Sequence, residues 1–153
     1  MGDSMQKFKQ WLEHYGPVVA RVLLAQVFIV SGIGKIKAFV GTATLMGNIG
    51  IPAPQLMLIL TIALEVGGGL LLIAGWQARY IALLFFGFTF LTAVLVHPFW
   101  VVEQANMGGH LNNFMKNLSI MGGMLYVVIH GPGPLSLGRE TWQTESSQGK
   151  KKK

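Results

Sequence analysis

Residues 55–76 read QLMLILTIALEVGGGLLLIAGW, a stretch in which Glu65 is the only charged residue. A helix that crosses the hydrocarbon core of a bilayer, about 30 Å thick, needs about 20 predominantly apolar residues. The stretch has this length and this character. It therefore predicts a membrane-spanning helix that carries one carboxylate.

Three more stretches extend this pattern on both sides, over residues 17–36, 80–97 and 113–130. Pro98 follows one of them, and the run Gly131-Pro132-Gly133-Pro134 follows the last. Proline and glycine commonly stand where helices end. We expect an all-α protein, an integral membrane four-helix bundle formed by residues 17–137.

The composition agrees with a membrane protein and excludes several other classes. Hydrophobic residues make up 52% of the 153 residues and charged residues 12%, whereas about a quarter of an ordinary soluble domain is charged. Four of the 12 basic residues are the terminal lysines 150–153, which argues against a nucleic-acid partner. The chain has no cysteine, so it forms no disulfide, thiolate zinc site or iron–sulfur cluster of its own.

The two ends of the chain differ from the bundle. Residues 1–16 include five apolar side chains on one helical face, which predicts a short amphipathic helix on the membrane surface; they are Met5, Phe8, Trp11, Leu12 and Tyr15. No cleavage motif follows residues 17–36, so a signal anchor is favoured over a cleaved signal peptide. Residues 138–153 are polar and polybasic, and we expect a disordered tail that either pairs with anionic lipid or only helps to set topology.

The distribution of positive charge predicts the orientation. With four spans both termini lie on one side, which carries nine of the Lys and Arg residues, whereas Lys35, Lys37 and Lys116 lie on the other. The positive-inside rule then places both termini in the cytoplasm. Residues 38–50 on the outer side are too few to span the bilayer and too apolar to be exposed to water. We expect an interfacial or re-entrant helix there.

Glu65 is the clearest candidate for a functional residue. It lies ten residues after Gln55, about 15 Å deep at 1.5 Å per residue, near the bilayer midplane. An ionised carboxylate there costs a few kcal/mol or more, so it should be paired, protonated or facing water. Possible partners lie on one face of residues 17–36, formed by Arg21, Ala25, Phe28, Gly32 and Lys35 and bordered by Ser31.

The predicted topology gathers further polar residues above Glu65. The candidate polar pocket consists of Arg21, Ser31, Lys35, Glu65, His97, Asn113, Lys116 and Asn117. Simpler roles stay open: Lys35 and Lys116 could extend to the interface, His97 and Asn113 could cap helices, and Glu65 could form a purely structural ion pair. Arg79 is interpreted as a topology anchor.

The histidines give a weak metal signal. His97 could be joined by Glu103 and His110 from the outer loop, but the four histidines lack the spacing of a metal site. We therefore predict no metal site, and the sequence assigns no catalytic residue.

The order and spacing of these residues resemble the DoxX/DoxD family of small four-helix membrane proteins. The resemblance covers about residues 17–137 and rests on these pieces: Arg21, Ser31-Gly32-x-x-Lys35, Glu65 with Gly68-Gly69, Gly75-x-x-x-Arg79, Ala93-x-x-x-His97, Asn113-x-x-Lys116-Asn117 and Gly131-Pro132-Gly133-x-x-Ser136-Leu137. Many members end the last motif with an acidic residue, where this chain has Gly138. If that carboxylate normally pairs with a basic group, the pairing is missing here.

The resemblance implies a multi-pass protein of the bacterial inner membrane. DoxD-type subunits belong to a thiosulfate:quinone oxidoreductase, and some DoxX proteins anchor oxidative-stress and sulfur-redox partners. The resemblance thus implies an accessory or anchor subunit of a redox partner enzyme, not an enzyme on its own, with no intrinsic cofactor beyond a bound quinone.

Two other functions stay open, and a homo-oligomer is compatible with both. One is a small proton-coupled transporter that titrates Glu65 and oligomerises to widen its conduit. The other is a membrane scaffold whose termini recruit a cytosolic partner.

Overall fold

The computed structural model describes residues 2–138, and this part of the chain is helical and contains no strand. The predicted polybasic tail lies outside the described residues, apart from Gly138. The elements are α1 (Gly2–Lys37), α2 (Phe39–Asn48), α3 (Pro54–Ile62), the π-helix η1 (Ala63–Gly68), α4 (Gly69–Ala74), α5 (Ala78–Val96) and α6 (Gln104–His130). α3, η1 and α4 follow one another without a break and form one rod.

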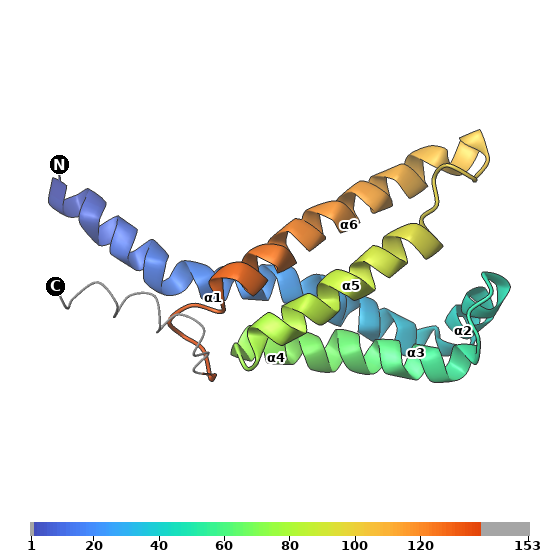
Figure 1. Cartoon of the computed structure of the whole chain (residues 1–153), viewed down its shortest axis with the longest axis horizontal. Helices are drawn as coiled ribbons and strands as arrows, with labels where there is room; N and C mark the ends of the chain where they lie inside the picture. The colour runs from blue at the N-terminus through green and yellow to red at the C-terminus, as the bar shows by residue number, and fades with distance from the viewer. Residues whose placement is uncertain (1, 139–153) are drawn as a thin grey trace, which may run out of the picture.

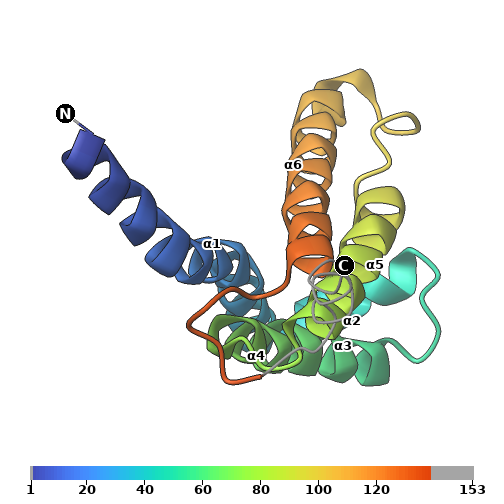
Figure 2. The ribbon, with the colours of Figure 1, turned by 60° about the vertical axis from the view of Figure 1, so that its left-hand side comes forward.

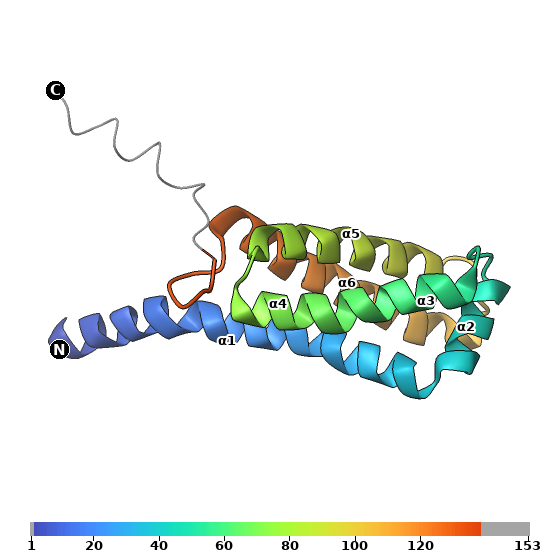
Figure 3. The ribbon, with the colours of Figure 1, turned by 90° about the horizontal axis from the view of Figure 1, so that it is seen from below.

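The long helices are arranged as two pairs. α1 packs on η1 and α4, and α5 packs along α6. The pairs converge near the turn between α4 and α5 and diverge toward α2 and the loop between α5 and α6 (Figures 1 and 2). We call the first of these ends the turn end and the second the loop end. The start of α1 and the last turn of α6 both lie at the turn end (Figure 3).

Three helical rods within residues 2–138 are long and apolar enough to cross a membrane: Gly2–Lys37, Pro54–Ala74 and Ala78–Val96. Many of their large apolar side chains are exposed in the isolated chain, for example Val30, Leu70 and Leu84. Such a surface suits a lipid environment. α6 is long enough but too polar in its first half to belong to this group, so the fourth span stays a prediction.

The core is built where small residues let the helices approach. Phe28 of α1 stacks on Phe85 of α5, with ring centroids 3.9 Å apart. Gly69 lies so close to α1 that a Cβ atom on it would stand 2.6 Å from Ile29 Cγ1. The predicted helix face on α1 is buried as expected at Arg21, Ala25, Phe28 and Gly32.

The N-terminal segment differs from the expected separate helix. Residues 2–16 continue directly into the first span, and Pro17 lies inside the 36-residue helix α1. The five apolar side chains predicted to touch the membrane surface are all exposed, between 44% and 68%. Their contact with lipid stays a prediction. Residues 39–48 form helix α2, whose depth in the membrane also stays a prediction.

Candidate functional site

Glu65 forms a buried ion pair with Lys35. The ammonium nitrogen of Lys35 lies 2.7 Å from Glu65 Oε1 and 2.8 Å from Oε2. The Glu65 side chain is 3% exposed and the Lys35 side chain 25%. This settles which of the two cations on the α1 face Glu65 reaches: it is Lys35.

Ser31 completes a triad with this pair. Its hydroxyl donates to Glu65 Oε1 over 3.1 Å and accepts from Lys35 Nζ over 2.6 Å. Ser31 and Lys35 stand four residues apart on α1, so they share one face. The lysine uses all three of its N–H donors on two carboxylate oxygens and one hydroxyl. The charge of Glu65 is thus compensated inside an apolar bundle.

Gly32 allows the triad to form. A Cβ atom at Gly32 would stand 2.7 Å from Val66 Cγ2 and 3.1 Å from Glu65 Cβ. The bare backbone lets η1 lie directly against α1, between the two triad residues of that helix. The close contact at Gly32 is therefore also what brings the carboxylate to its cation.

The local backbone around Glu65 is a π-helix, which the sequence did not predict. η1 covers Ala63–Gly68 inside an otherwise α-helical rod. π-helical turns are rare and occur frequently at functional sites. The glycines that follow Glu65, at positions 67–69, are the sequence signal that could have pointed to it.

Arg21 lies at the turn end and does not take part in the triad. Its guanidinium donates to the carbonyl oxygen of Ile73 over 2.9 Å and to that of Leu135. Gly75, with φ of +71°, leaves room for it, because a Cβ atom there would stand 2.0 Å from Arg21 Nη1. Arg21 thereby ties α1 to the end of α4 and to the segment after α6.

Arg79, interpreted from the sequence as a topology anchor, also lies inside the protein. It is 7% exposed and donates to the carbonyl oxygens of Val128 and Ile129. These carbonyls belong to the last turn of α6, where backbone acceptors lack helical partners. Arg79 therefore caps α6 and joins it to α5.

The remaining predicted pocket residues lie at or toward the loop end on α5 and α6. Lys116 is exposed and donates to Asn113 Oδ1 over 3.5 Å. His97 directly follows the last residue of α5, and Asn117 is half-buried on α6. None of the hydrogen bonds found between residues 2 and 138 joins these four residues to Glu65.

Helix register places Thr89 and Asn117 at the level of the triad. Thr89 follows Phe85 by one turn toward the loop end, and Phe85 contacts Gly68, one turn from Glu65. Leu24 of α1 contacts Gly123 of α6. Ser31 lies about 10 Å from this contact along α1, and Asn117 lies about the same distance from it along α6, both toward the loop end. Ser31 and Asn117 therefore stand at the same height in the bundle. We use the term polar level for these five residues: Ser31, Lys35, Glu65, Thr89 and Asn117.

Two atoms of this level are buried without a hydrogen bond. They are Thr89 Oγ1 and Asn117 Nδ2, and neither finds an acceptor or donor within residues 2–138. Thr89 is only 2% exposed. Buried polar groups are nearly always hydrogen-bonded, so each exception needs an explanation, such as strain, a catalytic role or a bound water or ion.

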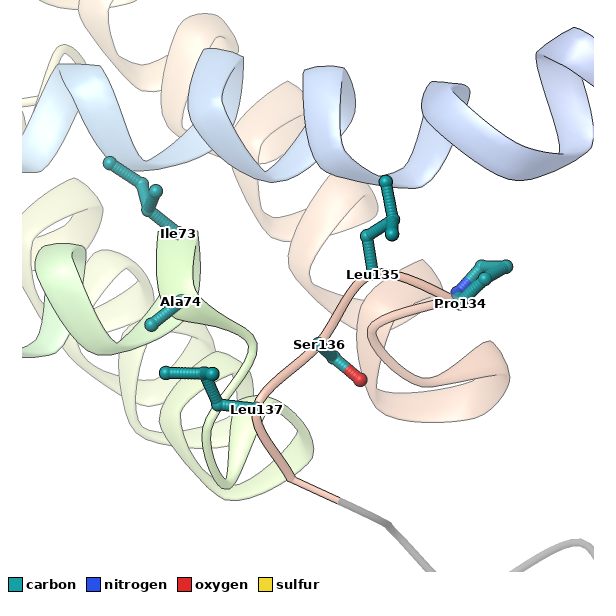
Figure 4. Close-up of a pocket in the computed structure, with 6 residues that line it drawn as sticks. All are labelled: Ile73, Ala74, Pro134, Leu135, Ser136 and Leu137. Atoms are coloured by element: carbon teal, nitrogen blue, oxygen red, sulfur yellow. The ribbon is translucent and has the colours of Figure 1, made fainter.

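A hollow of about 420 Å³ lies elsewhere, at the turn end (Figure 4). Its lining is formed by Ile73, Ala74, Pro134, Leu135, Ser136 and Leu137. Ser136 is the only one of these with a polar side chain, and none of them is titratable. The hollow offers no chemistry comparable with that of the triad.

Comparison with known proteins gives a consistent result. The sequence profile of the DoxX family matches residues 16–98. Inner membrane protein YqjF of Escherichia coli K12 is 44% identical over 130 residues, which cover 84% of this chain and 93% of the relative. Inner membrane protein YphA of the same organism is 37% identical over 122 residues, 80% of this chain and 87% of the relative. No solved structure gives a significant match.

Proposed function

The chain belongs to the DoxX family of inner-membrane proteins, and from this premise we propose that it is an accessory or anchor subunit of a redox system. In this proposal the polar level binds the headgroup of a quinone from the bilayer. The chain is not an enzyme on its own and acts with a partner subunit.

The observation that carries the proposal is the buried Glu65 carboxylate in the middle of the apolar rod Pro54–Ala74, paired with Lys35 near the end of α1. Charged residues within membrane helices are costly and usually mark a functional site. The pair sits where α1 and the π-helix η1 meet, at the same height along the bundle as the unsatisfied polar atoms of Thr89 and Asn117. A quinone dissolved in the bilayer could approach this level between helices.

The residue types suit a quinone headgroup. Each quinone carbonyl accepts hydrogen bonds, and the Thr89 hydroxyl and the Asn117 amide are donors that have no acceptor in the described chain. Lys35 and Glu65 supply a proton-bearing pair nearby, as proton transfer to a reduced quinone requires. Because the chain has no cysteine, electrons would come from a partner subunit and pass to the quinone.

We further propose a four-span topology with both termini in the cytoplasm. α6 would be the fourth span, supported by its long contact with α5 and by its apolar second half, residues 118–129. The polar first half of α6 would then lie at the outer surface together with the loop end.

Quinone extraction tests the proposed function. The protein is purified in mild detergent and extracted for bound quinone, with Thr89→Val as the main variant. Thr89 makes no hydrogen bond, so the substitution removes a donor at almost constant shape and should leave folding intact. Thr92→Val is the matched control, because the Thr92 hydroxyl bonds to the Phe88 carbonyl of its own helix.

We expect near-stoichiometric quinone in the wild type and in Thr92→Val. Thr89→Val should lower the amount, and Glu65→Gln should deplete it. Absence of quinone from the wild-type protein, or equal retention in all four proteins, would refute the quinone site.

A further inference from the structure

His97 and His110 come together at the loop end, although 13 residues separate them in sequence. Their ring centroids lie 5.7 Å apart with an angle of 65° between the ring planes. His97 follows the end of α5, and His110 lies in the second turn of α6. The hairpin formed by these helices creates the pair.

Both imidazoles have a buried nitrogen without a partner. Nδ1 of His97 and Nδ1 of His110 are inaccessible and make no hydrogen bond to any atom of residues 2–138. A buried polar atom without a hydrogen-bond partner destabilises a fold. Two such atoms on adjoining rings suggest that one species satisfies both.

The surroundings hold the two rings in place. Phe99, Trp100 and Phe114 form a cluster with ring centroids 5.1–5.8 Å apart. Phe99 and Trp100 come directly after His97 in the loop, and Phe114 lies one turn after His110 on α6. The aromatic cluster therefore fixes the loop against α6 beside the histidines.

From this arrangement we propose that His97 and His110 form an open two-histidine site for a divalent transition-metal ion such as Zn²⁺. Imidazole nitrogen is a preferred ligand for zinc, copper and nickel ions. No group of three or more His, Asp or Glu side chains that could hold a metal occurs in the described part of the chain. Water, or a group from a substrate or partner, would occupy the other coordination positions.

The ring separation fits one shared ion. With a Zn–N distance of about 2.0–2.1 Å, each ring centroid lies about 3.2 Å from the metal. A tetrahedral angle between two such ligands would put the centroids about 5.2 Å apart. The observed centroid separation of 5.7 Å corresponds to a nitrogen–metal–nitrogen angle of about 130°. A small rotation of either ring would bring this angle to the tetrahedral value.

Zinc titration of the full-length protein tests the site. The protein is purified in detergent through a tag without histidine, stripped with chelator and titrated with ZnCl₂ at pH 7.5 by calorimetry. The variants are His97→Gln and His110→Gln. The control is the double variant His14→Gln/His130→Gln, which removes the other two histidines of the chain and leaves the pair intact.

We expect one Zn²⁺ per chain in the wild type and the control, and binding at least about tenfold weaker in each single variant. Zinc binding should also weaken below about pH 6 as protons compete for imidazole. Unchanged binding in both single variants, or loss of binding in the control, would overturn the proposal.

A second measurement needs no variant and therefore does not depend on variant folding. Diethyl pyrocarbonate modifies accessible imidazoles, and mass spectrometry locates the products. Zn²⁺ should protect His97 and His110 but not His14 or His130. Protection of neither residue of the pair, at a concentration where calorimetry shows binding, would also overturn the site.

Discussion

Removing one partner of the Lys35–Glu65 pair should have very different effects depending on which partner is removed. Lys35→Met keeps a side chain of similar length but leaves the Glu65 carboxylate, 3% exposed, with only the Ser31 hydroxyl. Glu65→Gln leaves the Lys35 ammonium, which is a quarter exposed and sits on a flexible stem that can reach toward water. The amide can still accept hydrogen bonds from Lys35 and Ser31.

The geometry sets the size of the difference. Two unit charges 2.7 Å apart attract each other by about 6 kcal/mol at an effective dielectric constant near 20. Desolvation of both groups cancels part of this, so breaking a buried pair by removing one partner typically costs about 3–5 kcal/mol. We expect this loss of stability for Lys35→Met and about 1–2 kcal/mol for Glu65→Gln, in which hydrogen bonds to an ammonium persist.

The double variant Lys35→Met/Glu65→Gln should be more stable than Lys35→Met alone, because it leaves no charge buried. The assay is unfolding of detergent-solubilised protein by increasing mole fractions of sodium dodecyl sulfate, followed by far-ultraviolet circular dichroism. The reasoning is refuted if Glu65→Gln is the more damaging single change. It is equally refuted if the double variant equals the sum of the singles within about 0.5 kcal/mol, which would mean that the residues do not interact.

Two further predictions concern helix contacts. Gly32→Ala should lower the free energy of unfolding by about 1–3 kcal/mol, because the added methyl group collides with Val66 in a packed contact. Gly34→Ala is the control, because nothing lies within 4 Å of a Cβ atom at Gly34; it should raise the free energy of unfolding by up to about 1 kcal/mol. The same detergent titration compares the two variants. Equal effects would contradict the close contact of α1 with η1. Arg79→Met should remove the cap of α6, at a cost of about 1.5–3 kcal/mol, and speed amide hydrogen exchange in the first turn of α5 and the last turn of α6. Unchanged exchange there would show that Arg79 does not hold these helices together.

Much of the helical organisation could be predicted from the sequence. Hydrophobic stretches and proline–glycine boundaries gave the long helices, because span length and helix termination are local properties of the chain. The buried stripe of α1 followed from helical periodicity, as did the choice of Arg21 and Lys35 as possible partners for Glu65. The choice between these two partners needed the relative shift of α1 and η1, which only packing determines.

Other features depend on contacts that sequence spacing does not reveal. The roles of Arg21 and Arg79 were missed, because each binds main-chain carbonyls about 50 or more residues away. Backbone carbonyls carry no residue-specific signal. The sequence named His110 as a possible companion of His97 but predicted no metal site, because the histidines lack regular ligand spacing along the chain. Their proximity follows from the packing of α5 against α6.

The link from Arg21 to Leu135 has a consequence for biosynthesis. The arginine lies in α1, which is made before the other described helices, whereas one of its acceptors is made 114 residues later. Before that, the Ile73 carbonyl satisfies only part of the guanidinium, and the remaining donors need lipid phosphate, water or the insertion machinery as a temporary partner. The final arrangement of α1 is therefore completed only after α6 is in place, and a nascent chain that stops before residue 135 would present a partly satisfied arginine for quality-control proteases to recognise.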